Sequence, residues 1–267
     1  MTSFNAPLGI FYGVFSFVFG LLFGSFGNVV IARLPEKESV VHPRSRCPHC
    51  KNQISWHDNI PLISYLVLRG KCRNCKKPIS IRYPIIELLS GLLFLFIYLK
   101  TGLNWTMLEL IIFAWAGLVA STIDIDRRIL PDVITLPGIV IGLIGAALNP
   151  DRHFLDGLIG VIGGGGFLWL VAYVYAAVRN EEGMGGGDIK LIAWIGAVLG
   201  WRAVIFSILV SSITGSLFGI SVAAFKKSGL KTAIPFGPFL YFAAILFIFI
   251  GTDVMKAYLA IFFPFVD

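Results

Sequence analysis

The residues best placed to do chemistry are two aspartates, each at a junction between polar and apolar sequence. Asp188 closes the glycine-dense segment 183–188 (GMGGGD), and Asp124 lies in segment 121–126 (STIDID), where an apolar run ends. A carboxylate at the mouth of a membrane helix is costly and is retained mainly when it pairs or takes part in chemistry. Glycines let the backbone approach an extended peptide closely. We therefore predict that Asp124 and Asp188 face each other and cut a peptide bond at the membrane surface.

Paired carboxylates can hydrolyse a peptide without a metal or a covalent intermediate. Two carboxylates that share a site cannot both ionise easily, so one proton is held between them. The ionised partner draws a proton from the water that attacks the scissile carbonyl, and the protonated partner polarises that carbonyl.

Neighbouring acids offer simpler roles. Asp132 begins an apolar run, where an acid complements the helix dipole. Asp126 is suited to an ion pair with a nearby base such as Lys190, and Asp188 itself could cap the helix that follows it. Sequence physics alone does not choose between Asp124 and Asp126.

All four cysteines form two C-x-x-C pairs, Cys47 with Cys50 and Cys72 with Cys75. Two such pairs at this spacing are typical of a structural zinc ribbon with four thiolate ligands. Two disulfides are the alternative, which a reducing cytoplasm disfavours. An insert of about fifty residues also has little core of its own, so we predict that zinc is needed for it to fold. With four ligands the site is closed, which assigns the metal a structural role.

Composition indicates a polytopic membrane protein. The 267 residues are 57% hydrophobic and 14% charged, and the mean hydropathy is +0.82. This combination is typical of chains that cross a bilayer several times. The net charge of +7 could indicate nucleic acid or anionic lipid. Membrane proteins concentrate Lys and Arg in cytoplasmic loops, so we predict contact with membrane lipid and none with nucleic acid.

The apolar runs predict an all-α fold with about eight transmembrane helices and a small cytoplasmic zinc-ribbon-like insert between helices 1 and 2. The runs lie at 8–32, 84–99, 106–123, 132–148, 157–178, 189–200, 203–224 and 236–262. We predict three regions: a first transmembrane helix in residues 1–32, a zinc-binding domain in 33–83, and a membrane peptidase core in 84–267.

The distribution of basic residues predicts the orientation. With the N-terminus outside, the segments 33–83, 124–131, 179–190 and 225–232 face the cytoplasm and hold eighteen of the 22 Lys and Arg residues. An excess of this size fixes the orientation of short loops. Asp124 and Asp188 then both lie at the cytoplasmic face.

A wider set of motifs resembles the type IV prepilin peptidases, which are membrane aspartyl proteases of the G-x-G-D kind. It comprises segments 24–35 (GSFGNVVIARLP), the two cysteine pairs, 60–65 (IPLISY), 82–88 (RYPIIEL), 123–126 (IDID), 130–132 (LPD), 182–191 (EGMGGGDIKL) and 235–238 (PFGP). These motifs follow the family's order from about residue 20 to 250. One departure is Gly27, where many members carry leucine, and we expect little consequence.

The resemblance implies a bifunctional enzyme of the bacterial inner membrane. Such enzymes remove the basic leader of type IV prepilins and type II secretion pseudopilins after a glycine, at the cytoplasmic face. They then N-methylate the new N-terminus with S-adenosylmethionine. The family pattern assigns catalysis to Asp124 and Asp188. The active-site loop would contain Gly183, Gly185, Gly187 and Lys190.

The site for the methyl donor has no recognisable motif. A Rossmann-type glycine fingerprint is absent from the sequence, so we expect the donor near residues 28–35 and Glu87 without naming a binding residue. The particular substrates and the oligomeric state are not predicted. Three other readings remain: another intramembrane G-x-G-D protease, an ion-coupled transporter that uses the two aspartates, and a non-catalytic assembly protein.

Overall fold

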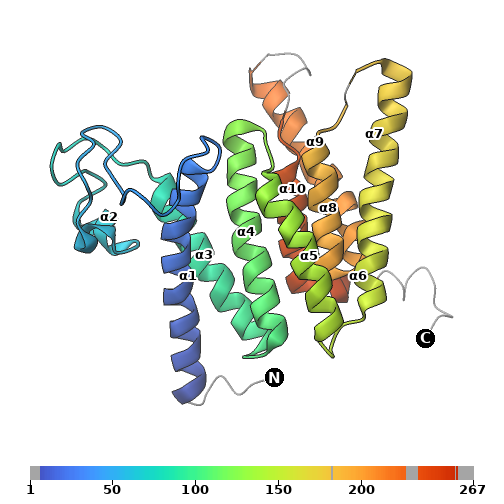
Figure 1. Ribbon diagram of the computed structural model, residues 1–267, viewed down its shortest axis with the longest axis horizontal. Coiled ribbons are helices and arrows are strands. Elements are labelled where there is room, and N and C mark those ends of the chain that lie inside the picture. Colours follow the sequence, from blue (N-terminus) through green and yellow to red (C-terminus); the bar gives the residue numbers. More distant parts are fainter. Residues whose placement is uncertain (1–6, 182, 227–233, 256, 258–267) are drawn as a thin grey trace. The chain divides into compact units, whose positions relative to one another are not determined.

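The computed structural model describes residues 7–181, 183–226, 234–255 and 257, and these residues are mainly helical (Figure 1). The α-helices are α1 (Pro7–Arg33), α2 (Ile63–Val67), α3 (Arg82–Thr101), α4 (Trp105–Arg127), α5 (Asp132–Leu148), α6 (Phe154–Gly160), α7 (Gly166–Arg179), α8 (Gly186–Leu199), α9 (Trp201–Lys226) and α10 (Gly237–Leu246). The short 3₁₀ turn η1 (Trp56–Asn59) and the π-helical stretches η2 (Val161–Gly165) and η3 (Phe247–Gly251) complete the described helices.

Six helical stretches of the described residues are long and apolar enough to cross a membrane. They are Pro7–Arg33, Arg82–Thr101, Trp105–Arg127, Phe154–Arg179, Trp201–Ala224 and Gly237–Met255. The helices α5 and α8 fill the other two predicted runs but are shorter, so the count of eight spans stays a prediction. The end of the last predicted run, 258–262, lies outside the described residues.

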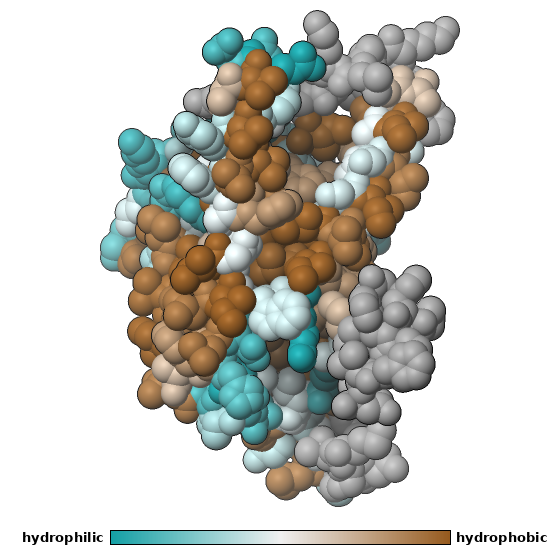
Figure 2. Space-filling model, turned by 90° about the vertical axis from the view of Figure 1, so that its right-hand side faces the viewer, coloured by the Kyte–Doolittle hydropathy of each residue, from teal (hydrophilic) through white to brown (hydrophobic). Residues whose placement is uncertain are grey.

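Apolar side chains face outward along these helices. In α7, Phe167, Leu170 and Val174 each expose half or more of their surface. Much of the face of the molecule shown in Figure 2 is correspondingly hydrophobic. A helix that presents large apolar side chains to its surroundings is suited to lipid and not to water.

The chain divides into two compact units, unit 1 (Met1–Val119) and unit 2 (Ala120–Asp267), and the division falls within α4. In unit 1, α1 packs closely along α3. A Cβ atom added to Gly20 would lie 2.7 Å from the Ser90 carbonyl oxygen, and one added to Gly24 would lie 2.6 Å from the Glu87 Cα atom. Small residues of this kind let two membrane helices approach backbone to backbone. A Cβ atom at Gly27 would lie 3.2 Å from Val119, so α4 fills the space beside that residue.

Polar contacts hold α1 to the start of α3 and to the insert between these two helices. Asn28 of α1 donates to the Tyr83 carbonyl of α3 at 3.1 Å, and the Arg33 guanidinium donates to two carbonyls of the following loop. Within the insert, Arg73 donates two hydrogen bonds of 2.6 and 2.7 Å to the Asp58 carboxylate. These bonds hold the pKa of Asp58 below its usual value. The pair therefore ties the 56–59 turn to the second cysteine pair.

In unit 2, α8 forms the centre of the helical packing. It contacts α5, α6, α7, α9 and α10, and every residue from Leu191 to Val198 is buried (Figure 1). A helix that is apolar on all sides and enclosed by other helices meets protein and not lipid. This enclosure explains how α8 can be shorter than the about 20 residues that a lipid-facing span needs.

The glycines of the α6–α7 segment serve two different roles. A Cβ atom added to Gly160 would lie 2.7 Å from the Gly196 carbonyl oxygen of α8, whereas one added to Gly163 would meet nothing within 4 Å. The absence of a side chain therefore permits close helix packing at Gly160 and not at Gly163.

We expect Gly160→Ala to destabilise unit 2, because the backbones of α6 and α8 must separate to admit a methyl group. The cost of such overpacking is about 1–3 kcal/mol. The matched change Gly163→Ala is expected to be neutral or to stabilise the helix by less than about 1 kcal/mol. Thermal unfolding of the purified protein in detergent measures both variants. Equal melting temperatures for the two would contradict the close contact.

Candidate active site and metal site

Asp124 lies in the last turn of α4 and is buried, with 5% of its surface exposed. Its carboxylate accepts a hydrogen bond from the Gly237 backbone N–H at the start of α10. The C-terminal end of a helix carries partial negative charge, which disfavours a carboxylate. Asp126, two residues further on, is exposed. The structure thus distinguishes Asp124 from Asp126, which the sequence alone could not do. Asp124 is the buried one, although burial at a helix C-terminus disfavours a carboxylate.

Asp188 is the third residue of α8 and is half-buried. Gly185, and not Asp188, is the N-cap of this helix. The Asp188 carboxylate interacts electrostatically with that of Asp124. The N-terminal end of a helix favours negative charge, so the dipole of α8 stabilises Asp188 where that of α4 opposes Asp124. The two carboxylates come from segments 64 positions apart in sequence and lie within range of each other's charge.

Leu130 packs against the glycines that begin α8 and α10, and the sequence alone predicts no role for it. Cβ atoms added to Gly187 and to Gly237 would lie 2.9 and 3.0 Å from the Leu130 side chain. Both glycines are therefore needed for the α4–α5 turn, α8 and α10 to meet. Leu130 and Gly237 both belong to motifs quoted from the sequence, at 130–132 and 235–238, and each stands beside a proline.

The other residues predicted for the active-site loop have different neighbours. Lys190 forms a 2.7 Å ion pair with Asp132 at the start of α5. Gly183 faces the ring of Tyr175, and Gly185 has open space where a side chain would lie. The exposed pair of Lys190 and Asp132 contributes little to stability, because solvent screens it. Gly183 and Gly187 are thus the loop glycines whose neighbours leave no room for a side chain.

The four cysteines form one cluster in the insert of unit 1. Their sulfur atoms all lie within 4.8 Å of one another, and those of Cys47 and Cys75 are 3.8 Å apart. Zinc–sulfur bonds of about 2.3 Å in a tetrahedron place the sulfurs roughly 3.8 Å apart. All four cysteines are free thiols and not disulfides. The donor set and its spacing therefore fit a metal ion of the zinc type.

Both cysteine pairs adopt the same turn. Lys51 and Lys76, which follow the second cysteine of each pair, have φ of 59°, and each N–H donates to the carbonyl of the first cysteine at 2.9 and 3.0 Å. Although burial disfavours the Cys47 thiolate, backbone N–H groups of Cys50 and His49 lower the pKa of Cys47 to about 6. These donors favour the thiolate form that a metal requires.

Comparison with known proteins identifies the family. The model of the bacterial peptidase A24 N-terminal domain matches residues 18–101, and that of the type IV leader peptidase family matches residues 111–220. The chain is 39% identical to a prepilin leader peptidase/N-methyltransferase of Stutzerimonas stutzeri, covering 91% of this chain and 92% of that protein. The protein of the same name from Pseudomonas aeruginosa is 37% identical, covering 90% and 91% of the two chains. One from Myxococcus xanthus is 41% identical over 87% of this chain and 70% of its own length.

The chain belongs to the type IV leader peptidase family. The N-terminal domain match covers the cysteine cluster, and the leader peptidase match covers both aspartates. Gly237, whose N–H donates to Asp124, lies beyond both matched ranges. No solved structure matches the chain.

In this leader peptidase, we expect Gly237→Ala to impair whatever chemistry Asp124 performs. The added methyl group would lie 2.6 Å from the Asp124 carboxylate and must displace it. A displacement of about 1 Å in a catalytic group can cost about 10²-fold in rate. Gly215→Ala in α9 is the matched control, because its Cβ atom would be 3.7 Å from its nearest neighbour, Phe239. Cleavage rates for a prepilin substrate compare the two variants. Equal rates would show that Gly237 has no positioning role.

Proposed function

We propose that this chain is a membrane aspartyl peptidase that removes the leader of prepilins or pseudopilins. Asp124 and Asp188 would act as the catalytic pair, with Gly183, Gly185, Gly187 and Lys190 in the loop beside the substrate. The observation that carries the proposal is that the carboxylates of Asp124 and Asp188 lie within range of each other's charge, in a chain similar, over about nine-tenths of its length, to prepilin leader peptidases. Family membership favours this function over an ion-coupled transporter and over other G-x-G-D proteases.

The reaction would use the pair as a shared acid and base. One carboxylate holds a proton, because two negative charges in one poorly hydrated place repel each other. The ionised carboxylate takes a proton from water as the water attacks the scissile carbonyl, while the protonated one donates a hydrogen bond to the carbonyl oxygen. The leader would be cut after a glycine, at the cytoplasmic face of the bacterial inner membrane. Substrate and membrane lipid are the partners that this proposal requires.

The proposal includes a second activity, N-methylation of the new N-terminus with S-adenosylmethionine as donor. It follows from the names of the relatives, each a prepilin leader peptidase/N-methyltransferase. It also assigns the regions: a membrane anchor in 1–32, a zinc-stabilised domain in 33–83 and the peptidase core in 84–267. Zinc would be held by Cys47, Cys50, Cys72 and Cys75, where it would stabilise the insert without taking part in either reaction.

The test is a reaction of the purified full-length protein with a synthetic prepilin in liposomes, followed by mass spectrometry. We expect the leader to be lost, and the mature product to gain one methyl group only when S-adenosylmethionine is present. Failure of a folded protein to cleave several prepilins and pseudopilins would overturn the peptidase proposal.

The orientation has its own test. A reporter enzyme that is active only outside the cytoplasm, fused after residue 180, is expected to be inactive. High activity of that fusion would place the loop before α8 on the outer face and reject a cytoplasmic active site.

A further inference from the structure

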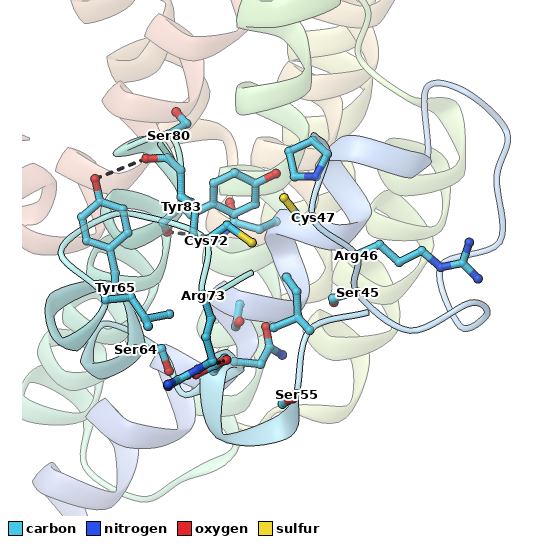
Figure 3. Close-up of a pocket in the computed structure, with 18 of the residues that line it drawn as sticks. Ser45, Arg46, Cys47, Ser55, Ser64, Tyr65, Cys72, Arg73, Ser80 and Tyr83 are labelled. Carbon is cyan, nitrogen blue, oxygen red and sulfur yellow. Dashed lines mark hydrogen bonds and ion pairs between the residues drawn. The ribbon is translucent and has the colours of Figure 1, made fainter. Parts of the chain in front are cut away.

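A cavity of about 840 Å³ lies within unit 1, where α1, the insert and α3 meet (Figure 3). Its volume falls in the range of roughly 300–1,000 Å³ that is usual for small-molecule sites. Asn28 and Ala32 line it from α1, Tyr65 from α2, and Tyr83 and Glu87 from α3. The lining residues all belong to unit 1, whereas both aspartates belong to unit 2.

Glu87 brings a buried carboxyl group to this cavity. It is 8% exposed, and the hydrogen-bond donors recorded for its carboxylate are neutral: the Leu62 N–H at 2.9 Å and the Ser25 hydroxyl. Buried carboxylates are ordinarily paired with a cation, because desolvating a lone charge is costly. The other acid in the wall, Asp58, already binds Arg73. Glu87 therefore provides a place for a cationic group that the described residues do not supply.

The turn that Glu87 holds is strained. Leu62 has φ of 60° and ψ of −50°, and the Ile63 N–H donates to the Pro61 carbonyl across it at 2.6 Å. This tight turn is unfavourable for a residue with a side chain, and such turns persist mainly where the surroundings fix them, often at ligand sites. The Glu87 carboxylate fixes this one by accepting the Leu62 N–H. The carboxylate is thereby held in place before any ligand arrives.

We infer that this cavity is the binding site for S-adenosylmethionine and that Glu87 is the counter-ion for the donor's cationic end. The inference rests on the proposed methyltransferase activity and adds to it a location and a residue. When bound, the donor supplies a methyl group on a positively charged sulfur; its amino group carries a second positive charge and its carboxylate a negative one. The Glu87 carboxylate would bind the positively charged sulfur and amino group and so orient the donor in the cavity.

The walls of the cavity suit the rest of the donor. A purine ring needs flat or apolar neighbours and a few polar groups for orientation. The rings of Tyr65 and Tyr83 lie around the cavity with polar side chains of the insert among them (Figure 3). The Tyr65 hydroxyl donates to the Ile79 carbonyl at 3.4 Å, and Asn28 donates to the Tyr83 carbonyl. Both tyrosines are thus tied to the wall that they form.

The experiment measures equilibrium binding of S-adenosylmethionine to the full-length protein in detergent by calorimetry, without any peptide. We expect Glu87→Gln to weaken binding at least tenfold. Glutamine keeps the shape and still accepts the Leu62 N–H. Glu109→Gln on α4 is the matched control, because Glu109 does not line the cavity. Ala32→Phe fills the cavity without changing a polar group and is expected to abolish binding.

Leader cleavage, measured in the same preparations, separates this inference from the proposed function. Unchanged cleavage in both variants shows that the protein is folded. If Glu87→Gln and Ala32→Phe both bind S-adenosylmethionine as tightly as the wild-type protein does, the cavity assignment is wrong. The methyltransferase proposal then stands. If the wild-type protein cleaves the leader but binds no S-adenosylmethionine, both the cavity assignment and the methyltransferase proposal are wrong. A peptide with a free N-terminal phenylalanine is titrated separately. If Glu87→Gln weakens only that peptide, the carboxylate faces the substrate amine, and its assignment to the donor is wrong.

Discussion

Asp124→Asn and Asp188→Asn are each expected to reduce leader cleavage by at least about 10³-fold. A positioned general acid or base contributes about 10²–10⁴-fold to a reaction rate. In the proposed mechanism, each substitution removes one of the two carboxylates that share the proton. Because the two act as one unit, the double variant is expected to be no slower than either single variant. Cleavage is measured as leader loss from a synthetic prepilin by mass spectrometry.

Asp126→Asn is the matched control for this prediction. Asp126 is exposed and lies two residues from Asp124 on the same helix, so it tests the same chemical change at the same membrane depth. Its cleavage rate is expected to stay within about twofold of wild type, as for a surface substitution. Full activity in Asp124→Asn together with loss in Asp126→Asn would transfer the catalytic role to Asp126. Methylation of an already mature peptide is expected to persist in the aspartate variants.

Cys47→Ser is expected to remove bound zinc and unfold the insert. Structural zinc sites contribute about 10–16 kcal/mol of apparent free energy to folding, and removing one ligand opens the tetrahedron. The four sulfurs within 4.8 Å of one another form this site from two turns that are far apart in the sequence. Metal analysis of protein purified without chelators reports the loss, and limited proteolysis between residues 33 and 83 reports the unfolding.

His49→Ala is the control for the metal site. His49 stands between two of the cysteines, so this substitution alters the same turn without removing a thiolate. One zinc per chain is expected in wild type and in His49→Ala. Zinc bound equally by Cys47→Ser would mean that the four thiolates are not the ligands. Wild type without zinc would reject the metal and leave the cysteines as free thiols.

Local sequence was sufficient for most of the helices and for the metal cluster. The first and fifth predicted runs, 8–32 and 157–178, differ from α1 and the α6–α7 stretch by three residues or fewer at each end. Apolar composition dominates such segments, so their limits are easily read. The cysteine pairs were equally informative, because each C-x-x-C turn depends on its own few residues and both adopt one backbone form.

Contacts between distant segments could not be read from sequence. Nothing in the local pattern links Gly237 to Asp124, which are more than one hundred residues apart, or Glu87 to Leu62. The choice between Asp124 and Asp126 also depended on which side of α4 other residues enclose, and the sequence of α4 does not show that. The environment of α8 is another such feature: the usual length rule assumes that lipid surrounds a span, whereas other helices surround α8.

The hydrogen bond from Gly237 to Asp124 comes from the main chain. An amide N–H neither gains nor loses a proton in ordinary conditions, and exchange of one side chain for another leaves it in place; only proline removes it. This donor to Asp124 thus depends on the path of the backbone between two prolines and not on the chemistry of the side chain at position 237. Diverging sequences can therefore change much of α10 and still present the same donor to the aspartate, provided that position 237 stays small.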